Sequence, residues 1–183
     1  MSALSNLAGL YPPTGEQKWN PNLDWQPIPV HTLPVEEDII LSNHPPCPKY
    51  DKLFQALMNS SEIRDLNKKY DWVYKYATEH SGKVIDSIGS AAYLYDTLHI
   101  ETIYNKTLPP WTSKIYPEPL GTLQNLSFHV DTWTTAMKRL RFGSLVKAVV
   151  NRMSQVAAGL HVNGSFDGPK MIMYSAHDTT VSG

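Results

Sequence analysis

The feature that most constrains this chain is a helical repeat of apolar residues that runs, with one interruption, from Leu123 to Leu160. Apolar side chains recur at alternating steps of three and four residues, which is the spacing of one face of an α-helix. Gly143 interrupts the repeat. We therefore predict either one helix that bends near Gly143 or two adjacent amphipathic helices.

A short apolar run, KMIMYS at 170–175, follows these helices after a loop at 161–168. Its length, its apolar content and the turn residues around it indicate a buried strand. A helix that leads into a buried strand is typical of α/β architecture. The chain is therefore predicted to belong to the α/β fold class.

Earlier parts of the chain combine shorter helices with proline-rich connections. Pro12 and Pro13 should end the first helix, because proline lacks a backbone N–H group and clashes with the preceding turn. Pro27 and Pro29 place an early strand at the edge of a sheet or at a sheet boundary. The expected elements are a helix over the first ten residues, a strand over 26–33, two or three short helices over 49–79 and a stronger helix over 83–99.

The composition of the 183 residues excludes several classes of protein. Hydrophobic residues make up 42% and charged residues 18%, which is typical of a packed globular chain. The net charge of −1 gives little electrostatic support for nucleic-acid binding. No apolar run approaches the ~18–20 residues that a membrane-spanning helix needs. The single cysteine, Cys47, excludes an internal disulfide and a cysteine-based zinc site.

Four N-x-S/T sequons indicate passage through the secretory pathway, the alternative being a chance excess with no sugar attached. Their asparagines are Asn59, Asn105, Asn125 and Asn163. The N-terminus nevertheless carries no signal peptide, so we expect the chain to be an internal fragment of a longer parent protein. Cys47 is then either a free thiol or half of a disulfide whose partner is missing. The sequons favour the disulfide.

The most informative chemistry is the dipeptide His177-Asp178, which follows the predicted strand. In open α/β sheets, ligands bind at the carboxyl ends of the strands. If a helix begins near Thr179, its free backbone N–H groups favour an anion such as phosphate. His177 can contact that anion, and Asp178 can donate a proton to a leaving oxygen. The simpler alternative is that Asp178 caps the helix and His177 only packs.

Other candidate sites carry a weaker signal. Metal-dependent phosphohydrolases also use a His-Asp pair, but within a helical bundle, and here only His129 near Asp131 hints at a metal-ligand spacing. No metal site is therefore predicted. His31, on the early strand, is better explained as a buried or edge histidine with its hydrogen bonds satisfied. Four arginines are expected on solvated helix faces, namely Arg64, Arg139, Arg141 and Arg152.

Five stretches of the sequence match the pattern of a known family. They are NLAGLYPP (6–13), WNPNLDWQPIPVHTLP (19–34), CPKYDKL (47–53), YDTLHIETIYNKTLPPW (95–111) and YSAHDTTVSG (174–183). They resemble the histidine acid phosphatases of the animal lysosomal and prostatic type, over the whole chain. The resemblance implies an α/β core of the histidine phosphatase (phosphoglycerate mutase-like) kind with an inserted helical lobe. Residues 1–35 and 119–183 would belong to the core and 36–118 to the mostly helical lobe.

The resemblance also implies a reaction. Members of this family hydrolyse phosphate monoesters at acid pH through a phosphohistidine intermediate, and they need no metal or other cofactor. His177 matches a residue that contacts the phosphate, and Asp178 matches the proton donor. The family motif R-H-G-x-R-x-P supplies the nucleophilic histidine and two phosphate-binding arginines, and it is absent from the 183 residues. The further arginine that clamps the phosphate in this family also has no match here. We therefore expect this chain to be inactive alone.

Two departures from the family concern cysteines. Ile100 stands where the family usually has a cysteine, and Cys47 matches a cysteine whose partner lies beyond position 183. The implied parent is a lysosomal or extracellular phosphatase acting on a phosphomonoester, and a homodimeric parent is compatible with this interpretation. The alternative, from another functional class, is a non-catalytic binding protein on a degenerate phosphatase fold.

The sequons generate a first prediction. In the parent protein expressed in animal cells, at least two of the four should carry glycan. Asn105 and Asn163 are the best candidates, because Pro109 and Gly164 mark exposed connections. Glycosidase treatment should increase mobility on a denaturing gel. Unchanged mobility would count against passage through the secretory pathway.

Overall fold

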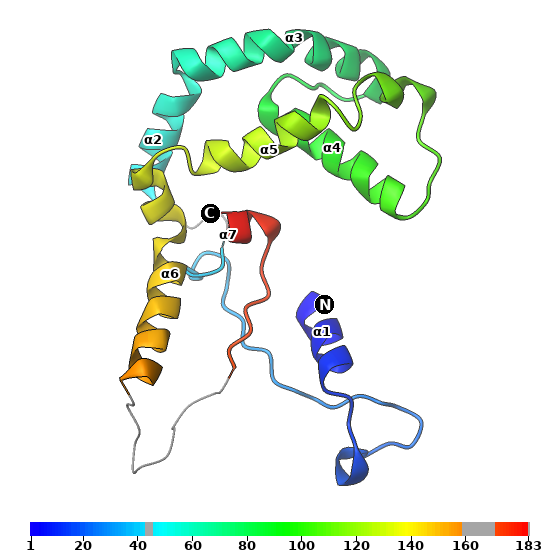
Figure 1. The fold of residues 1–183 in the computed structure, drawn as a ribbon, viewed down its shortest axis with the longest axis vertical. Helices are drawn as coiled ribbons and strands as arrows, with labels where there is room; N and C mark the ends of the chain where they lie inside the picture. Colours follow the sequence, from blue (N-terminus) through cyan, green and yellow to red (C-terminus); the bar gives the residue numbers. More distant parts are fainter. Residues whose placement is uncertain (43–45, 159–170, 183) are drawn as a thin grey trace.

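The structure is a computed structural model, and it describes residues 1–42, 46–158 and 171–182. Within these ranges the chain forms helices and extended connections and no strand (Figure 1). In chain order the elements are α1 (Ser2–Leu10), η1 (Gly15–Gln17), α2 (Pro48–Met58), α3 (Ser61–Ser81), α4 (Ile88–Ile103), η2 (Pro110–Lys114), α5 (Leu120–Asp131), α6 (Thr135–Ala157) and α7 (Asp178–Ser182). No helix in these ranges is at once long and apolar enough to span a bilayer.

Local signals in the sequence explain where the first helices begin and end. Helix α1 ends at Leu10, just before Pro12 and Pro13, as predicted. Two helices, α2 and α3, occupy the region where two or three were predicted. At the start of α3, the Ser60 hydroxyl accepts a hydrogen bond from the backbone N–H of Ile63 at 3.3 Å. Helix α3 ends at Gly82, whose φ of 71° favours glycine.

Helix α4 begins later than the apolar pattern predicts. Ser87 and Ser90 form a reciprocal capping box that fixes its first turn at Ile88. Val84, which the repeat places on the helix, lies before it and is exposed. The helix then runs to Ile103, past the predicted end at residue 99.

Two helices, α5 and α6, carry the long apolar repeat as far as Ala157, but the chain breaks at 132–134 and not near Gly143. The Thr134 hydroxyl accepts a hydrogen bond from the backbone N–H of Met137 at 3.2 Å, which caps the new helix. Gly143 lies inside α6, which is one continuous helix from Thr135 to Ala157. The predicted pair of helices is confirmed, whereas the predicted position of the break is wrong.

The core lies between α2, α3, α4, α5 and the start of α6, in the upper part of Figure 1. Helices α4 and α5 share the most extensive packing, while α2 contacts both α3 and α6. The side chains with no exposed surface are Ile63, Val73, Ala77, Ala91, Ile115, Leu120, Leu123 and Met137. Helix α1 contributes no buried residue and stands apart from this core.

The buried strand predicted at 170–175 is not formed by its described residues, 171–175. Side chains from Met171 to Tyr174 are between 36% and 56% exposed. A strand needs a neighbour that completes its ladder of hydrogen bonds, and no described segment supplies one. One side-chain contact, from Asn6 Nδ2 to Met173 Sδ at 3.2 Å, joins the segment to α1.

The edge strand predicted over 26–33 is likewise absent, and this segment is extended without strand pairing. Prolines at 27 and 29 remove two of the backbone donors that a ladder requires. The described residues are therefore helical, and the predicted α/β core is not seen among them.

Candidate functional site

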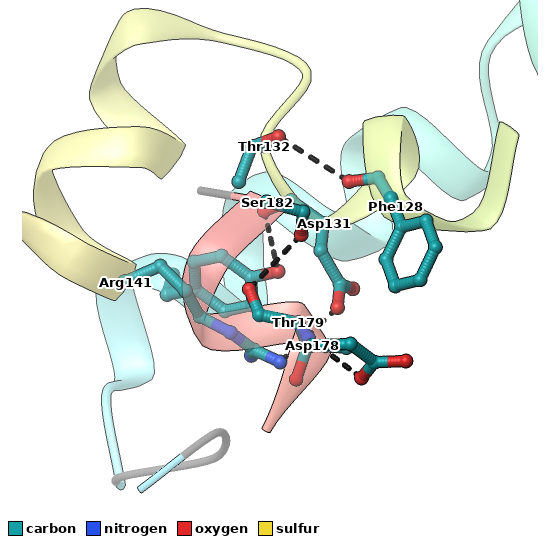
Figure 2. A network of polar contacts seen from close by, with 8 residues as sticks. Phe128, Asp131, Thr132, Arg141, Asp178, Thr179 and Ser182 are labelled. Atoms are coloured by element: carbon teal, nitrogen blue, oxygen red, sulfur yellow. Dashed lines mark hydrogen bonds and ion pairs between the residues drawn. The ribbon is translucent and has the colours of Figure 1, made fainter. Parts of the chain in front are cut away.

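The His177-Asp178 pair lies at the start of the short helix α7. The Asp178 carboxylate Oδ1 accepts a hydrogen bond from the backbone N–H of Thr179 at 2.7 Å (Figure 2). The carbonyl of His177 accepts from the backbone N–H of Thr180 at 3.1 Å. Thr180 is buried, and it anchors the helix. A helix was predicted to begin near Thr179, and α7 begins one residue earlier, at Asp178.

Asp178 faces a cavity of about 400 Å³ between α2, α4, α5 and α7. Its lining residues are Phe54, Met58, Ser87, Ile88, Gly89, Ala92, Tyr93, Asp96, Gln124, Ser127, Phe128, Val130, Asp131, Asp178 and Thr179. Figure 2 shows Asp178 and Thr179 beside Asp131 and Phe128. His177 is exposed and does not line this cavity, so the structure brings only one member of the predicted pair into it.

The charged residues on the cavity wall are all acidic, namely Asp96, Asp131 and Asp178. No Lys, Arg or His is among the described residues that line it. A phosphate in this cavity would face carboxylates with no compensating cation among the lining residues, which is unfavourable because like charges repel. The predicted phosphate contact therefore needs groups other than these lining residues.

A buried arginine holds one wall of the cavity in place. Arg141 Nη2 lies 3.3 Å from Asp131 Oδ2, and only 4% of the arginine side chain is exposed. The guanidinium carbon lies 4.8 Å from the ring centroid of Tyr50. The Tyr50 hydroxyl in turn donates a hydrogen bond to the Asp131 carbonyl at 2.9 Å. These contacts join α2, α5 and α6.

The prediction that Arg141 lies on a solvated helix face is wrong. Because α6 begins at Thr135, position 141 turns toward α2 and the end of α5, where Tyr50 and Asp131 receive the guanidinium. Arg64 and Arg139 are exposed, as predicted. Arg152 is only half-buried.

The remaining candidates lie away from the cavity. His31, which was predicted to be a buried or edge histidine, is exposed in an extended segment and is therefore not buried, and His129 is exposed on α5. No group of three His, Cys, Asp or Glu side chains in the described ranges is placed to hold a metal ion. Cys47 is a half-buried free thiol at the residue before α2.

The glycosylation candidates that the structure describes are accessible. Asn59, Asn105 and Asn125 are all exposed, at the ends of α2 and α4 and on α5. Asn105 has a positive φ of 52°, a conformation that asparagine tolerates better than most residues. Asn163 lies outside the described residues.

The sequence patterns do not indicate Asp96 and Tyr93 on α4, or the position of Asp131 on the cavity wall, as parts of a site. These residues meet only because α4 and α5 pack against each other, and a single sequence carries no signal for that pairing. The helical repeat places Tyr95 and Leu98 on the buried face of α4. From the same pattern, Asp96 is predicted to be an ordinary solvent-exposed residue with no role in a site.

Comparison with known proteins matches all of residues 1–183 to the family described as the histidine phosphatase superfamily (branch 2). A lysosomal acid phosphatase from Xenopus laevis is 36% identical over 99% of this chain and 42% of its own length. The lysosomal acid phosphatase from Homo sapiens is 35% identical, with the same shares covered. The prostatic acid phosphatase from Homo sapiens is 37% identical over 100% of this chain and 47% of its own. The chain thus spans less than half the length of these relatives.

The buried tyrosine beside Arg141 generates a second prediction. Burial raises the pKa of Tyr50 from 10.0 to about 12, with the Arg141 charge opposing the shift. Burial also raises the pKa of Tyr74 to about 12. Because the folded state favours the neutral phenol, the free energy of unfolding is unaffected by the ionisation of these tyrosines below pH 10. It falls as the pH rises from 10 toward 12, since the phenols ionise first in the unfolded state. Each tyrosine should contribute up to ~3 kcal/mol to that loss.

Urea unfolding measured at intervals across this pH range checks the prediction. Tyr50→Phe should flatten the fall in unfolding free energy, since phenylalanine has no proton to lose. Tyr11→Phe, at an exposed position, is the control and should leave the fall unchanged. Coincident pH profiles for Tyr50→Phe and the unchanged chain would contradict the burial of this phenol.

Proposed function

Because the chain belongs to the histidine phosphatase superfamily, branch 2, we propose that its parent protein is an acid phosphatase that hydrolyses phosphate monoesters through a phosphohistidine. The relatives that it matches are named lysosomal and prostatic acid phosphatases, which supports this proposal. The observation that carries it in the structure is the placement of Asp178: its carboxyl group lines a cavity large enough for an organic group.

Asp178 acts as the general acid in this proposal. A histidine nitrogen attacks the phosphorus, the bond from phosphorus to the leaving oxygen breaks, and protonated Asp178 gives that oxygen its proton. In this proposal His177, which is exposed next to Asp178, contacts the phosphate and not the leaving group. The bond from the Thr179 N–H to Asp178 Oδ1 orients the carboxyl group and leaves Oδ2 to carry the proton.

The 183-residue chain by itself should not turn over substrate. It contains no R-H-G-x-R-x-P motif, and no cation is among the described residues that line the cavity. Without the nucleophile there is no covalent intermediate, and without the arginines the charge that develops in the transition state is not stabilised.

The proposal extends to the architecture and location of the parent. Residues 1–35 and 119–183 would contribute to an α/β core, and 36–118 to a mostly helical lobe. The names of the relatives and the exposed sequons at Asn59, Asn105 and Asn125 support a lysosomal or extracellular location. Cys47 would form a disulfide in the parent.

A second candidate is a binding protein without catalysis. The acidic wall of the cavity favours this candidate. Three carboxylates with no cation among the lining residues can bind a ligand, but they would repel the phosphate group that a phosphatase must bind. The two candidates differ in whether the restored protein has turnover that depends on Asp178.

A chimera tests the proposed function. Residues 1–183 would replace the matching segment of the human prostatic acid phosphatase. The chimera should hydrolyse p-nitrophenyl phosphate best in mildly acid buffer, with or without chelator, and the 183-residue chain alone should give no rate above buffer. Asp178→Asn should lower the rate on an alkyl phosphate by about 10²–10⁴-fold, because an amide cannot donate the proton.

The effect of Asp178→Asn should be smaller on p-nitrophenyl phosphate, whose leaving group departs with less protonation. His177→Ala should slow both substrates alike, since it weakens contact with the phosphate. Asp65→Asn, at an exposed site on α3, is the matched control. Turnover by the 183 residues alone, or a chimera indifferent to Asp178→Asn on the alkyl phosphate, would overturn the proposal.

A further inference from the structure

The cavity beside Asp178 has the size and apolar lining of a site for a small organic molecule. Its volume of about 400 Å³ falls within the roughly 300–1,000 Å³ typical of ligand pockets. Three buried apolar side chains, Ile88, Ala92 and Val130, line it together with the half-buried Phe54 and Met58.

Aromatic rings and carboxylates complete the same cavity. Tyr93 and Phe128 stand on α4 and α5, on the walls that carry Asp96 and Asp131. The charge of Asp131 is met by the guanidinium of Arg141 at 3.3 Å. Asp96 and Asp178 form no ion pair within the described ranges, so two uncompensated carboxylates, both on exposed residues, line this largely apolar space.

We propose that this cavity binds the leaving group of the substrate, and that this group is an organic ammonium with an apolar or aromatic body. The charge of the ammonium would complement the carboxylates of Asp96 and Asp178, and the body would contact the apolar wall. The rings of Tyr93 and Phe128 add cation–π attraction. The assignment of this occupant as a leaving group rests on the proposed function; the binding of the ammonium itself does not.

The lining favours this occupant over two simpler ones. A phosphate would meet only carboxylates, so the anionic end of a substrate belongs outside the cavity. A bare metal ion needs several converging ligands, and the three carboxylates are not so grouped in the described structure. An organic cation satisfies both the charge and the apolar surface.

Direct binding to the 183-residue chain tests the inference without any turnover. Three probes of similar size differ in charge: phenethylamine is a cation, 2-phenylethanol is neutral and phenylacetate is an anion. Titration near neutral pH, followed by amide chemical shifts, should give phenethylamine a Kd on the order of 1 mM, a value set by its small size. The alcohol should bind about tenfold more weakly, and the anion should not bind measurably.

A pair of charge variants locates the site. Asp96→Asn should weaken phenethylamine binding severalfold and leave 2-phenylethanol unaffected, because it removes a charge from an exposed wall position and retains the shape. Asp65→Asn on α3 is the control and should change neither. Far-ultraviolet circular dichroism checks that each variant is folded.

Three results would overturn the inference. The first is equal affinity for the amine and the alcohol, and the second is no binding of the amine at a concentration about ten times the expected Kd. The third is an equal effect of Asp96→Asn and Asp65→Asn on binding of the amine. None of these results bears on the chimera's dependence on Asp178→Asn, so failure of the inference is distinguishable from failure of the proposed function. If the amine binds but the chimera is inactive, the cavity is still a binding site for an organic ammonium. Its occupant is then not the leaving group of a phosphatase substrate.

Discussion

The guanidinium of Arg141 lies where α2, α5 and α6 meet, with 4% of its side chain exposed. Removing such a charge from water costs several kcal/mol unless partners compensate for it. Asp131 supplies the opposite charge, and Tyr50 supplies an aromatic face and a hydrogen bond to the backbone of Asp131. The three groups fix the end of α5 at the point where the chain turns into α6.

The candidate site depends on that junction. Asp131 and Phe128 belong to the last turns of α5 and form one wall of the cavity, which Asp178 and Thr179 close from α7. The wall is acidic and apolar, so within the described residues the cavity suits the organic part of a ligand. In the proposed role of proton donor, a carboxyl group at this edge of the cavity would reach the leaving group of a substrate and not its phosphate.

Local patterns in the sequence predicted most helices, because capping residues and prolines act within a few positions. They predicted the start of α7, where the Asp178 carboxylate accepts a hydrogen bond from the backbone N–H of the next residue, Thr179. They misplaced the break in the long repeat, because the Thr134 cap outweighs a glycine inside a helix. They also missed Arg141 and Asp96, whose surroundings depend on how distant helices pack. The strand expected at 170–175 failed for a related reason: a strand is defined by its partner, and no described segment pairs with residues 171–175.

The unfolding free energy of two arginine variants on α6 tests most directly whether the Arg141 junction organises this fold. Arg141→Ala leaves the carboxylate of Asp131 without its cation in a partly buried site, and it should cost about 3–5 kcal/mol in urea unfolding. Arg139→Ala, two residues earlier and exposed, should cost no more than ~0.5 kcal/mol. Equal and small costs for the two variants would contradict the account.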